Sequence, residues 1–191
     1  MATKYPMAQL IMERRTIKKF KDESISTELL GELLEVASWA PNHKLREPWR
    51  FIIYNGEGKK VIANAIAEVA SKGAKMKKSP EEMKKYYESV PAHILVVMHE
   101  DPQPFVREED YAAVCALIQN FQLAAWEREV GVFWKTDSFL TLPEFREAAG
   151  VAPGEKIAAI LQVGYIDNVP KPRNRTAIDK KLTVIDGKDH E

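Results

Sequence analysis

Residues 111–126 read YAAVCALIQNFQLAAW and contain no charged side chain. They form the middle of a longer helical run, predicted over Glu108–Glu129, and Gly131 follows it. A helix that is uncharged on every side cannot lie across a surface, because none of its faces prefers water. The sequence therefore predicts that its longest helix runs through the core or along an interface.

Apolar spacing and turn signals predict the other elements. The other predicted helices are Met7–Arg15, a helix capped by Ser26 that ends before Pro41, Val61–Ala70, a helix that begins at Pro80 with a capping box, and Pro143–Ala149. The predicted strands are Trp49–Tyr54, Ile94–Met98, Val132–Trp134 and Ile157–Val163. Few strands separated by many helices, in irregular alternation, predict an α+β or mixed α/β fold.

Length and composition limit the class of protein. A chain of 191 residues fits one domain. Its 28 basic and 28 acidic side chains balance, so no overall field attracts nucleic acid or an anionic membrane. The single cysteine excludes an internal disulfide and any multi-cysteine metal site, and we expect no bound metal. With no signal peptide and no apolar run long enough to span a bilayer, we expect a cytoplasmic protein.

The densest group of charges is the stretch 14–21, RRTIKKFK. Its two arginines and its threonine hydroxyl can surround one phosphate, because arginine binds phosphate oxygens through two parallel hydrogen bonds. A solvated basic helix end explains the same residues, and the neutral net charge disfavours a third interpretation, a nucleic-acid patch. No G-x-G-x-x-G or P-loop sequence follows a strand, which disfavours a Rossmann-type site.

Three further stretches combine aromatic and polar side chains. They are 39–49 (WAPNHKLREPW), 133–137 (FWKTD) and 170–175 (PKPRNR). Each has a plain structural explanation, namely a packed loop, the end of a core strand and a solvated tail. None of them identifies a site by itself.

Taken together and in this order, the four stretches resemble the flavin-dependent nitroreductase family, in its compact, short-chain branch. The family's opening R-[RH]-[ST]-x-[RK] pattern is matched by Arg14, Arg15, Thr16 and Lys18. Its A-P…P-W-x-F, glycine-then-tryptophan and P-K-x-R patterns are matched by Ala40, Pro41, Pro48, Trp49, Phe51, Gly131, Trp134, Pro170, Lys171 and Arg173. The matches span residues 14–173, which is nearly the whole chain.

The resemblance implies a fold and an assembly. We expect an α+β, nitroreductase-like domain over residues 1–191, with a central, mostly antiparallel sheet flanked by helices. We expect an intertwined homodimer with shared sites, in which residues 165–191 form a C-terminal arm that packs on the partner subunit. The polar, proline-containing sequence after Gly164 agrees with this, because so long a segment without regular structure needs a surface to lie on.

The resemblance also implies a cofactor, FMN, and residues that bind it. Arg14, Arg15 and Thr16 would hold its phosphate and ribityl chain, and Lys18 would lie near the pyrimidine side of its ring. The remaining implied contacts are Lys171 and Arg173 at the phosphate, Trp134, Lys135 and Thr136 along the ring, and Trp39 and His43 from the partner subunit. The sequence departs from the family where many larger members carry an asparagine that touches the flavin, because Leu45 stands there.

The implied function is that of an FMN-dependent oxidoreductase. It would take hydride from NAD(P)H and pass it by a ping-pong mechanism to a small acceptor such as a nitroaromatic compound or a quinone. No side chain need act as a nucleophile or general base, because the cofactor supplies the chemistry. The alternatives are a flavin carrier without turnover, which would share every phosphate contact, and, more distantly, an RNA-binding protein.

Overall fold

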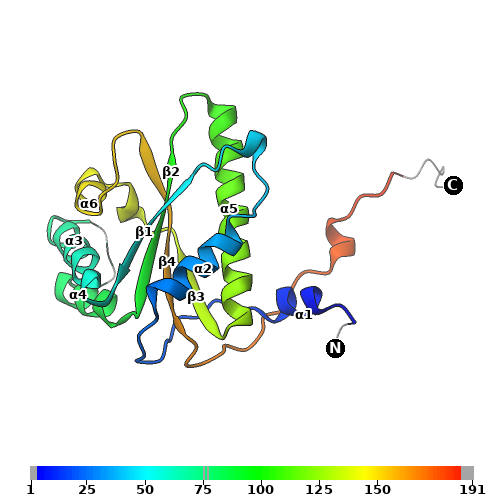
Figure 1. The fold of residues 1–191 in the computed structure, drawn as a ribbon, viewed down its shortest axis with the longest axis horizontal. Coiled ribbons are helices and arrows are strands. Elements are labelled where there is room, and N and C mark those ends of the chain that lie inside the picture. The colour runs from blue at the N-terminus through cyan, green and yellow to red at the C-terminus, as the bar shows by residue number, and fades with distance from the viewer. Residues whose placement is uncertain (1–3, 75, 77, 186–191) are drawn as a thin grey trace.

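A four-stranded antiparallel sheet forms the centre of the protein (Figure 1). The computed structural model describes residues 4–74, 76 and 78–185. The strands lie in the order β1-β2-β4-β3, and every neighbouring pair is antiparallel. They are β1 (Trp49–Asn55), β2 (Ala92–His99), β3 (Val130–Lys135) and β4 (Glu155–Tyr165). The predicted α+β fold with a mostly antiparallel sheet is thus confirmed.

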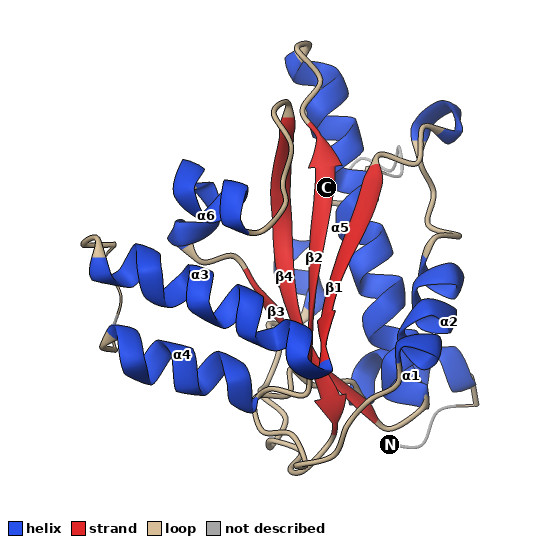
Figure 2. Ribbon diagram, turned by 60° about the vertical axis from the view of Figure 1, so that its left-hand side comes forward, coloured by secondary structure: helices blue, strands red, loops and turns tan. Residues whose placement is uncertain are grey.

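Helices cover both faces of this sheet (Figure 2). On one face lie α1 (Pro6–Glu13), α2 (Thr27–Ala37) and α5 (Pro104–Glu127). On the other lie α3 (Lys59–Ser71), α4 (Pro80–Ser89) and α6 (Pro143–Ala148). The apolar core accordingly has two halves, one on each side of the sheet. The central strand β2 is buried along nearly its whole length, because helices cover both of its faces.

The long uncharged helix lies where the sequence predicts it. In α5, Leu117, Ile118 and Phe121 are fully buried against the sheet and α2. Ala116 and Ala124 on the same helix are only partly buried within one chain. One face of α5 is therefore core, and another stays open at the surface of the single chain.

The other predicted elements are present, with ends within four residues of their predicted positions. The capping box at the start of α4 is confirmed, since the Ser79 hydroxyl accepts from the Glu82 backbone and the Glu82 carboxylate from the Ser79 backbone. The prediction that Arg14 and Arg15 form the last turn of the first helix is wrong. The chain becomes extended after Glu13, because Ile17 is drawn into the core beside β3.

Beyond β4 the chain leaves the body of the molecule. Residues 167–185 are exposed, and in Figure 1 they run past α1 and away from the sheet. Where no structure is predicted, a short 3-10 turn forms at Ile178–Lys181. Within the predicted arm 165–191, Tyr165 still belongs to β4, Ile166 pairs with Phe20, and residues 167–185 are exposed. Residues 186–191 lie outside the described residues, and the packing of the arm on a partner stays a prediction. Within the described ranges, no helix combines the length and apolarity needed to cross a membrane.

Candidate functional site

The candidate site lies along the outer edge of β3, where segment 14–21 runs beside the sheet. The Ile17 N–H donates to the Val132 carbonyl (3.2 Å), and the Lys21 N–H donates to the Tyr165 carbonyl (3.0 Å). These bonds hold the segment in an extended form. Because successive side chains of an extended chain alternate, the burial of Ile17 turns Thr16 and Lys18 outward.

Gly131 is what allows this segment to lie so close to the strand. A Cβ atom at position 131 would come within 2.6 Å of the Ile17 Cβ, which is closer than two carbon atoms can pack. Gly164, which pairs with Gly131 across β3 and β4, is crowded in the same way by Pro91 (2.6 Å). The glycine of the glycine-then-tryptophan pattern therefore has a structural reason at this site.

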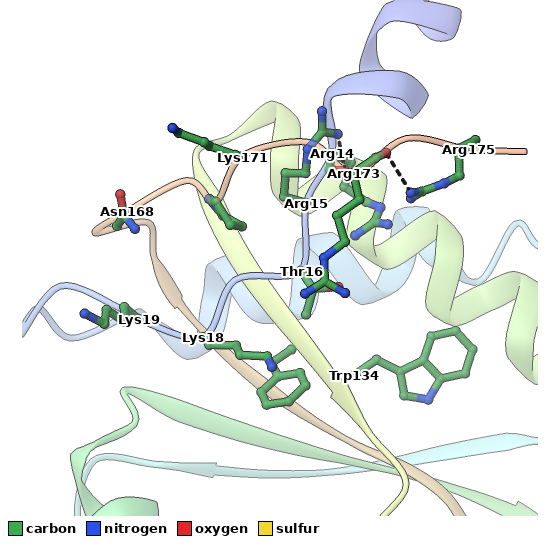
Figure 3. A pocket seen from close by; sticks show the side chains of 12 residues that line it. Arg14, Arg15, Thr16, Lys18, Lys19, Trp134, Asn168, Lys171, Arg173 and Arg175 are labelled. Carbon is green, nitrogen blue, oxygen red and sulfur yellow. Dashed lines mark hydrogen bonds between the residues drawn. The ribbon is translucent and has the colours of Figure 1, made fainter.

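A cavity of about 580 Å³ opens beside segment 14–21 (Figure 3). It is lined by Arg14, Arg15, Thr16, Lys18, Lys19, Phe133, Trp134, Asn168, Pro170, Lys171, Arg173 and Arg175. Seven of these side chains are basic and none is acidic. Figure 3 shows the four arginines gathered at one end, with Lys18 and Trp134 at the other. The arginine end has the charge and the geometry to bind an anion with several oxygens.

Among the described residues that line this cavity, Arg14 is the one with a buried hydrogen-bond donor that has no partner. It is half-buried, and its Nε is buried without a hydrogen-bond partner among the described residues. Its Nη1 reaches the Gln122 amide oxygen at 3.4 Å. Burial, and then the nearby charges of Arg15 and Arg175, lower the pKa of Arg14 from its usual value. An anion bound here would satisfy the orphaned N–H and offset the repulsion among the guanidinium groups.

A neighbouring cavity joins this site to α5. It shares Arg14, Thr16 and Trp134 with the first and adds Thr136 and two glutamines of α5, Gln119 and Gln122. These amides and hydroxyls are neutral donors and acceptors, which suit the polar edges of an uncharged ring or a polyol chain. The two cavities together offer an anion site at one end and neutral polar groups at the other.

The structure brings most of the predicted site residues together. Seven of them line the first cavity, namely Arg14, Arg15, Thr16, Lys18, Trp134, Lys171 and Arg173. Thr136 lines the neighbouring cavity, and Lys135 points to the opposite face of β3, where it lines a third cavity. Lys135 is therefore adjacent to the main cavity without lining it.

Trp39 and His43 lie apart from these cavities within one chain. Trp39 is 86% exposed, and His43 is also exposed. Both precede a strained loop in which Lys44, Leu45 and Glu47 all have positive φ angles. Two contacts stabilise this strained conformation. The Asn42 carboxamide oxygen accepts from the Glu47 N–H at 2.9 Å, and Arg46 forms an ion pair with the buried Asp110 at 3.0 Å.

This strained loop presents Leu45, which stands where the resemblance leads one to expect an asparagine, at 81% exposure. A rigid loop that displays apolar side chains to solvent is suited to contact another molecule. The assignment of Trp39 and His43 to a partner's site stays a prediction, because it concerns a second chain.

Several residues of the site were missed from the sequence. They are Lys19, Gln119, Gln122, Phe133, Asn168 and Arg175. The glutamines sit in the uncharged helical stretch and carry no local signal, since their role depends on which face of α5 meets β3. Arg175 belongs to the basic stretch 170–175. Because it is two residues after Arg173, an extended chain would point both side chains the same way, and this spacing could have predicted Arg175 as a site residue.

Comparison with known proteins gives a consistent result. The model of the nitroreductase family matches residues 11–165. The chain is 39% identical to "Putative NAD(P)H nitroreductase YfhC" of Bacillus subtilis over 93% of both chains. It is 42% identical to a nitroreductase-like family protein from Bacillus cereus, whose crystal structure superposes with a TM-score of 0.88 over 98% of this chain and 100% of the other. The FMN and NADPH-dependent nitroreductase NfnB from Sphigopyxis sp. strain HMH shares the fold at 15% identity (TM-score 0.77), with 95% and 99% of the two chains covered.

Proposed function

Because the chain belongs to the nitroreductase family, we propose that it is an FMN-dependent oxidoreductase that takes electrons from NAD(P)H. Two kinds of observation support this proposal. Two relatives that match more than nine-tenths of the chain, one from Bacillus subtilis and one from Bacillus cereus, carry nitroreductase names. Seven of the eleven predicted site residues line one cavity at the edge of the sheet.

The observation that carries the cofactor assignment is the acid-free, arginine-rich end of the cavity, with the orphaned Nε of Arg14. FMN ends in a phosphate that carries nearly two negative charges, and this donor set fits such a group. FAD fits less well, because the converging cations suit a terminal phosphate. The aromatic and neutral polar groups further along the cavity fit a flat ring with polar edges.

In this proposal each residue has a defined part. Arg14, Arg15, Lys171 and Arg173 bind the phosphate, and Thr16 holds the ribityl chain. Lys18 lies toward the pyrimidine side of the ring, where a cation favours the negatively charged reduced form. The chemistry that FMN supplies when bound is hydride transfer, from NAD(P)H and then, in ping-pong order, to an acceptor. No side chain of the protein is needed as a nucleophile or general base.

The acceptor in this proposal is a flat, electron-poor molecule such as a nitroaromatic compound or a quinone. A stacking site with few hydrogen-bond requirements rejects little, so we expect several acceptors to be turned over. The working form is a homodimer in which each chain contributes Trp39 and His43 to the partner's cavity and lays its arm, residues 165–191, on the partner. We place this activity in the cytoplasm, where NAD(P)H is available.

The test begins with an absorbance spectrum of the purified protein. A flavin spectrum is expected, with about one FMN per chain released by heat and identified against standards. Anaerobic addition of NADPH or NADH should then bleach the bound flavin, and an acceptor should restore its colour. A colourless protein that cannot be reconstituted with FMN contradicts the proposal. Bound flavin that neither nucleotide reduces would instead identify a flavin carrier.

A further inference from the structure

A third cavity, of about 650 Å³, lies on the opposite face of β3 from Trp134 and Thr136. It adjoins the proposed FMN cavity, because Lys18 and Phe133 line both. Its walls are largely apolar and aromatic, from Phe133, Tyr86 and Met83 among others. This cavity does not include the proposed phosphate site, and it is lined by aromatic and apolar side chains with lysines in place of arginines.

Three lysine ammonium groups are held over aromatic rings of this cavity. Lys18 lies 5.1 Å from the centre of the Phe133 ring, and Lys78 lies 4.9 Å from the Tyr86 ring. Lys135 lies 5.5 Å from both rings and is only 13% exposed. Cations placed over ring faces are held in position near the apolar wall and still present N–H donors to a ligand.

The single carboxylate in the lining, Asp137, is already engaged. It accepts from Lys135 at 2.9 Å, and the Lys135 ammonium group also donates to the Tyr87 hydroxyl at 3.0 Å. Burial and the Asp137 charge raise the pKa of Tyr87, which therefore stays a neutral hydroxyl. Lys18 and Lys78 form no ion pair with any other residue in the part of the chain that the structure describes. The cavity thus keeps an excess of positive charge beside flat apolar surfaces.

Arginine lines only one of these two cavities, whereas lysine lines both and Lys18 is shared between them. The first contains four arginines, which suit the many oxygens of a phosphate, whereas the third contains lysines alone. Lysine is a point charge and suits a single small anionic group on an otherwise apolar ligand. We propose that the third cavity binds the carboxylate of an aromatic electron acceptor, with the aromatic body against Phe133 and Tyr86. This inference rests on the proposed function, because only the neighbouring FMN makes the ligand an acceptor.

The binding test uses the purified protein with its bound FMN, without NAD(P)H. Calorimetric titration with 4-nitrobenzoate should give a Kd about tenfold lower than titration with the neutral 4-nitrobenzamide. The Lys78→Gln variant should weaken 4-nitrobenzoate binding by about 1.5- to 5-fold, the range for one exposed charged contact, and leave the amide unchanged. Lys85→Gln, an exposed lysine of α4 outside the cavity lining, is the matched control and should change neither.

A variant that is expected to strengthen binding distinguishes an electrostatic effect from damage to the fold. Asp137→Asn removes the cavity's carboxylate and should tighten 4-nitrobenzoate binding about threefold. Equal affinity for acid and amide, or equal losses in Lys78→Gln and Lys85→Gln, would overturn the proposal. A competition experiment with adenosine 2′,5′-bisphosphate, which reproduces part of NADPH, gives a further test. If this compound displaced 4-nitrobenzoate and bound more weakly to Lys78→Gln, the cavity would be a site for the nicotinamide dinucleotide, and the proposal would be overturned. The flavin spectrum of each sample reports separately on the proposed function.

Discussion

At the scale of single residues, Ile17 lies so close to Gly131 that a Cβ atom does not fit at position 131. Replacing Gly131 by Ala would force the Ile17 side chain away from the strand. Overpacking of this kind costs about 1–3 kcal/mol, and it would displace Thr16 and Lys18 on either side. We expect FMN affinity to fall at least about tenfold, measured by quenching of flavin fluorescence, together with a lower Tm.

Gly31, exposed on α2, supplies the control for this substitution. No atom lies within 4 Å of a Cβ added there. Because alanine is a better helix former than glycine, Gly31→Ala should raise stability by about 0.5–1 kcal/mol and leave FMN affinity unchanged. An unaltered FMN affinity in Gly131→Ala would show that the close approach of segment 14–21 does not position the cofactor.

Arg14 and Lys18 should have separable effects, because one lies at the arginine end of the cavity and the other at the ring end. Arg14→Ala removes charge-assisted hydrogen bonds worth roughly 1.5–3 kcal/mol, so FMN affinity should fall by about 10- to 150-fold. Lys18→Met should instead lower the flavin reduction potential, measured against a reference dye, with a smaller loss of binding. Two variants with the same behaviour would refute this division of roles.

At the scale of elements, β2 carries a buried histidine that couples stability to pH. His93 is fully buried, and its Nε2–H donates to the Tyr87 carbonyl at 2.7 Å. Burial lowers its pKa from about 6.5 to about 4. Between these values the unfolded chain binds a proton that the folded chain does not, so stability falls as pH falls through this window. The loss should approach roughly 3 kcal/mol by pH 4.

Urea unfolding at pH 7.5, 6 and 5 measures this dependence. His93→Gln should be less stable than the natural chain at pH 7.5, because it disturbs the contact with Tyr87. It should nevertheless show a flatter decline of the urea midpoint between pH 6 and 5. If the decline is as steep in the variant, groups other than His93 cause the acid sensitivity.

Sequence patterns predicted those helices and strands well whose position depends on interactions between residues close together in the sequence. The capping box fixes the start of α4, and the uncharged stretch in α5 predicts burial, because both depend on neighbours in sequence. The end of α1 was misplaced because the burial of Ile17 against β3 is a tertiary contact that overrides a local preference for helix. The roles of Gln119 and Gln122 were missed for a similar reason, since the sheet decides which face of α5 meets the cavity.

At the scale of the whole molecule, the proposed shared site predicts complementation between two defective chains. A chain with Arg14→Glu should hold no FMN as a homodimer, and a chain with Trp39→Ala and His43→Ala should hold it poorly. In a hybrid of the two, one site collects both defects and the other is built from intact residues. The hybrid, purified with two tags, should carry close to one FMN per dimer and regain up to half the activity.

Each parental variant, purified alone from the same expression, is the reference for this experiment. A hybrid that binds no more FMN than its parents would show that the sites are not shared between chains in this way. Sequence patterns predicted the arginine end of the site because its residues cluster in two short stretches. They predicted Trp39 and His43 only through resemblance, because a contact between chains leaves no trace in the spacing of one chain.

The exposed arm has a consequence for how the protein behaves in dilute solution. It carries Lys171, Arg173 and Arg175, which line the cavity, on a segment that the body of its own chain leaves uncovered. With a partner holding the arm in place, dimerisation and flavin binding become linked equilibria, and each must strengthen the other by the same factor. Diluting the yellow protein should then release its pigment, and excess FMN should hold the two chains together at concentrations where the apoprotein separates.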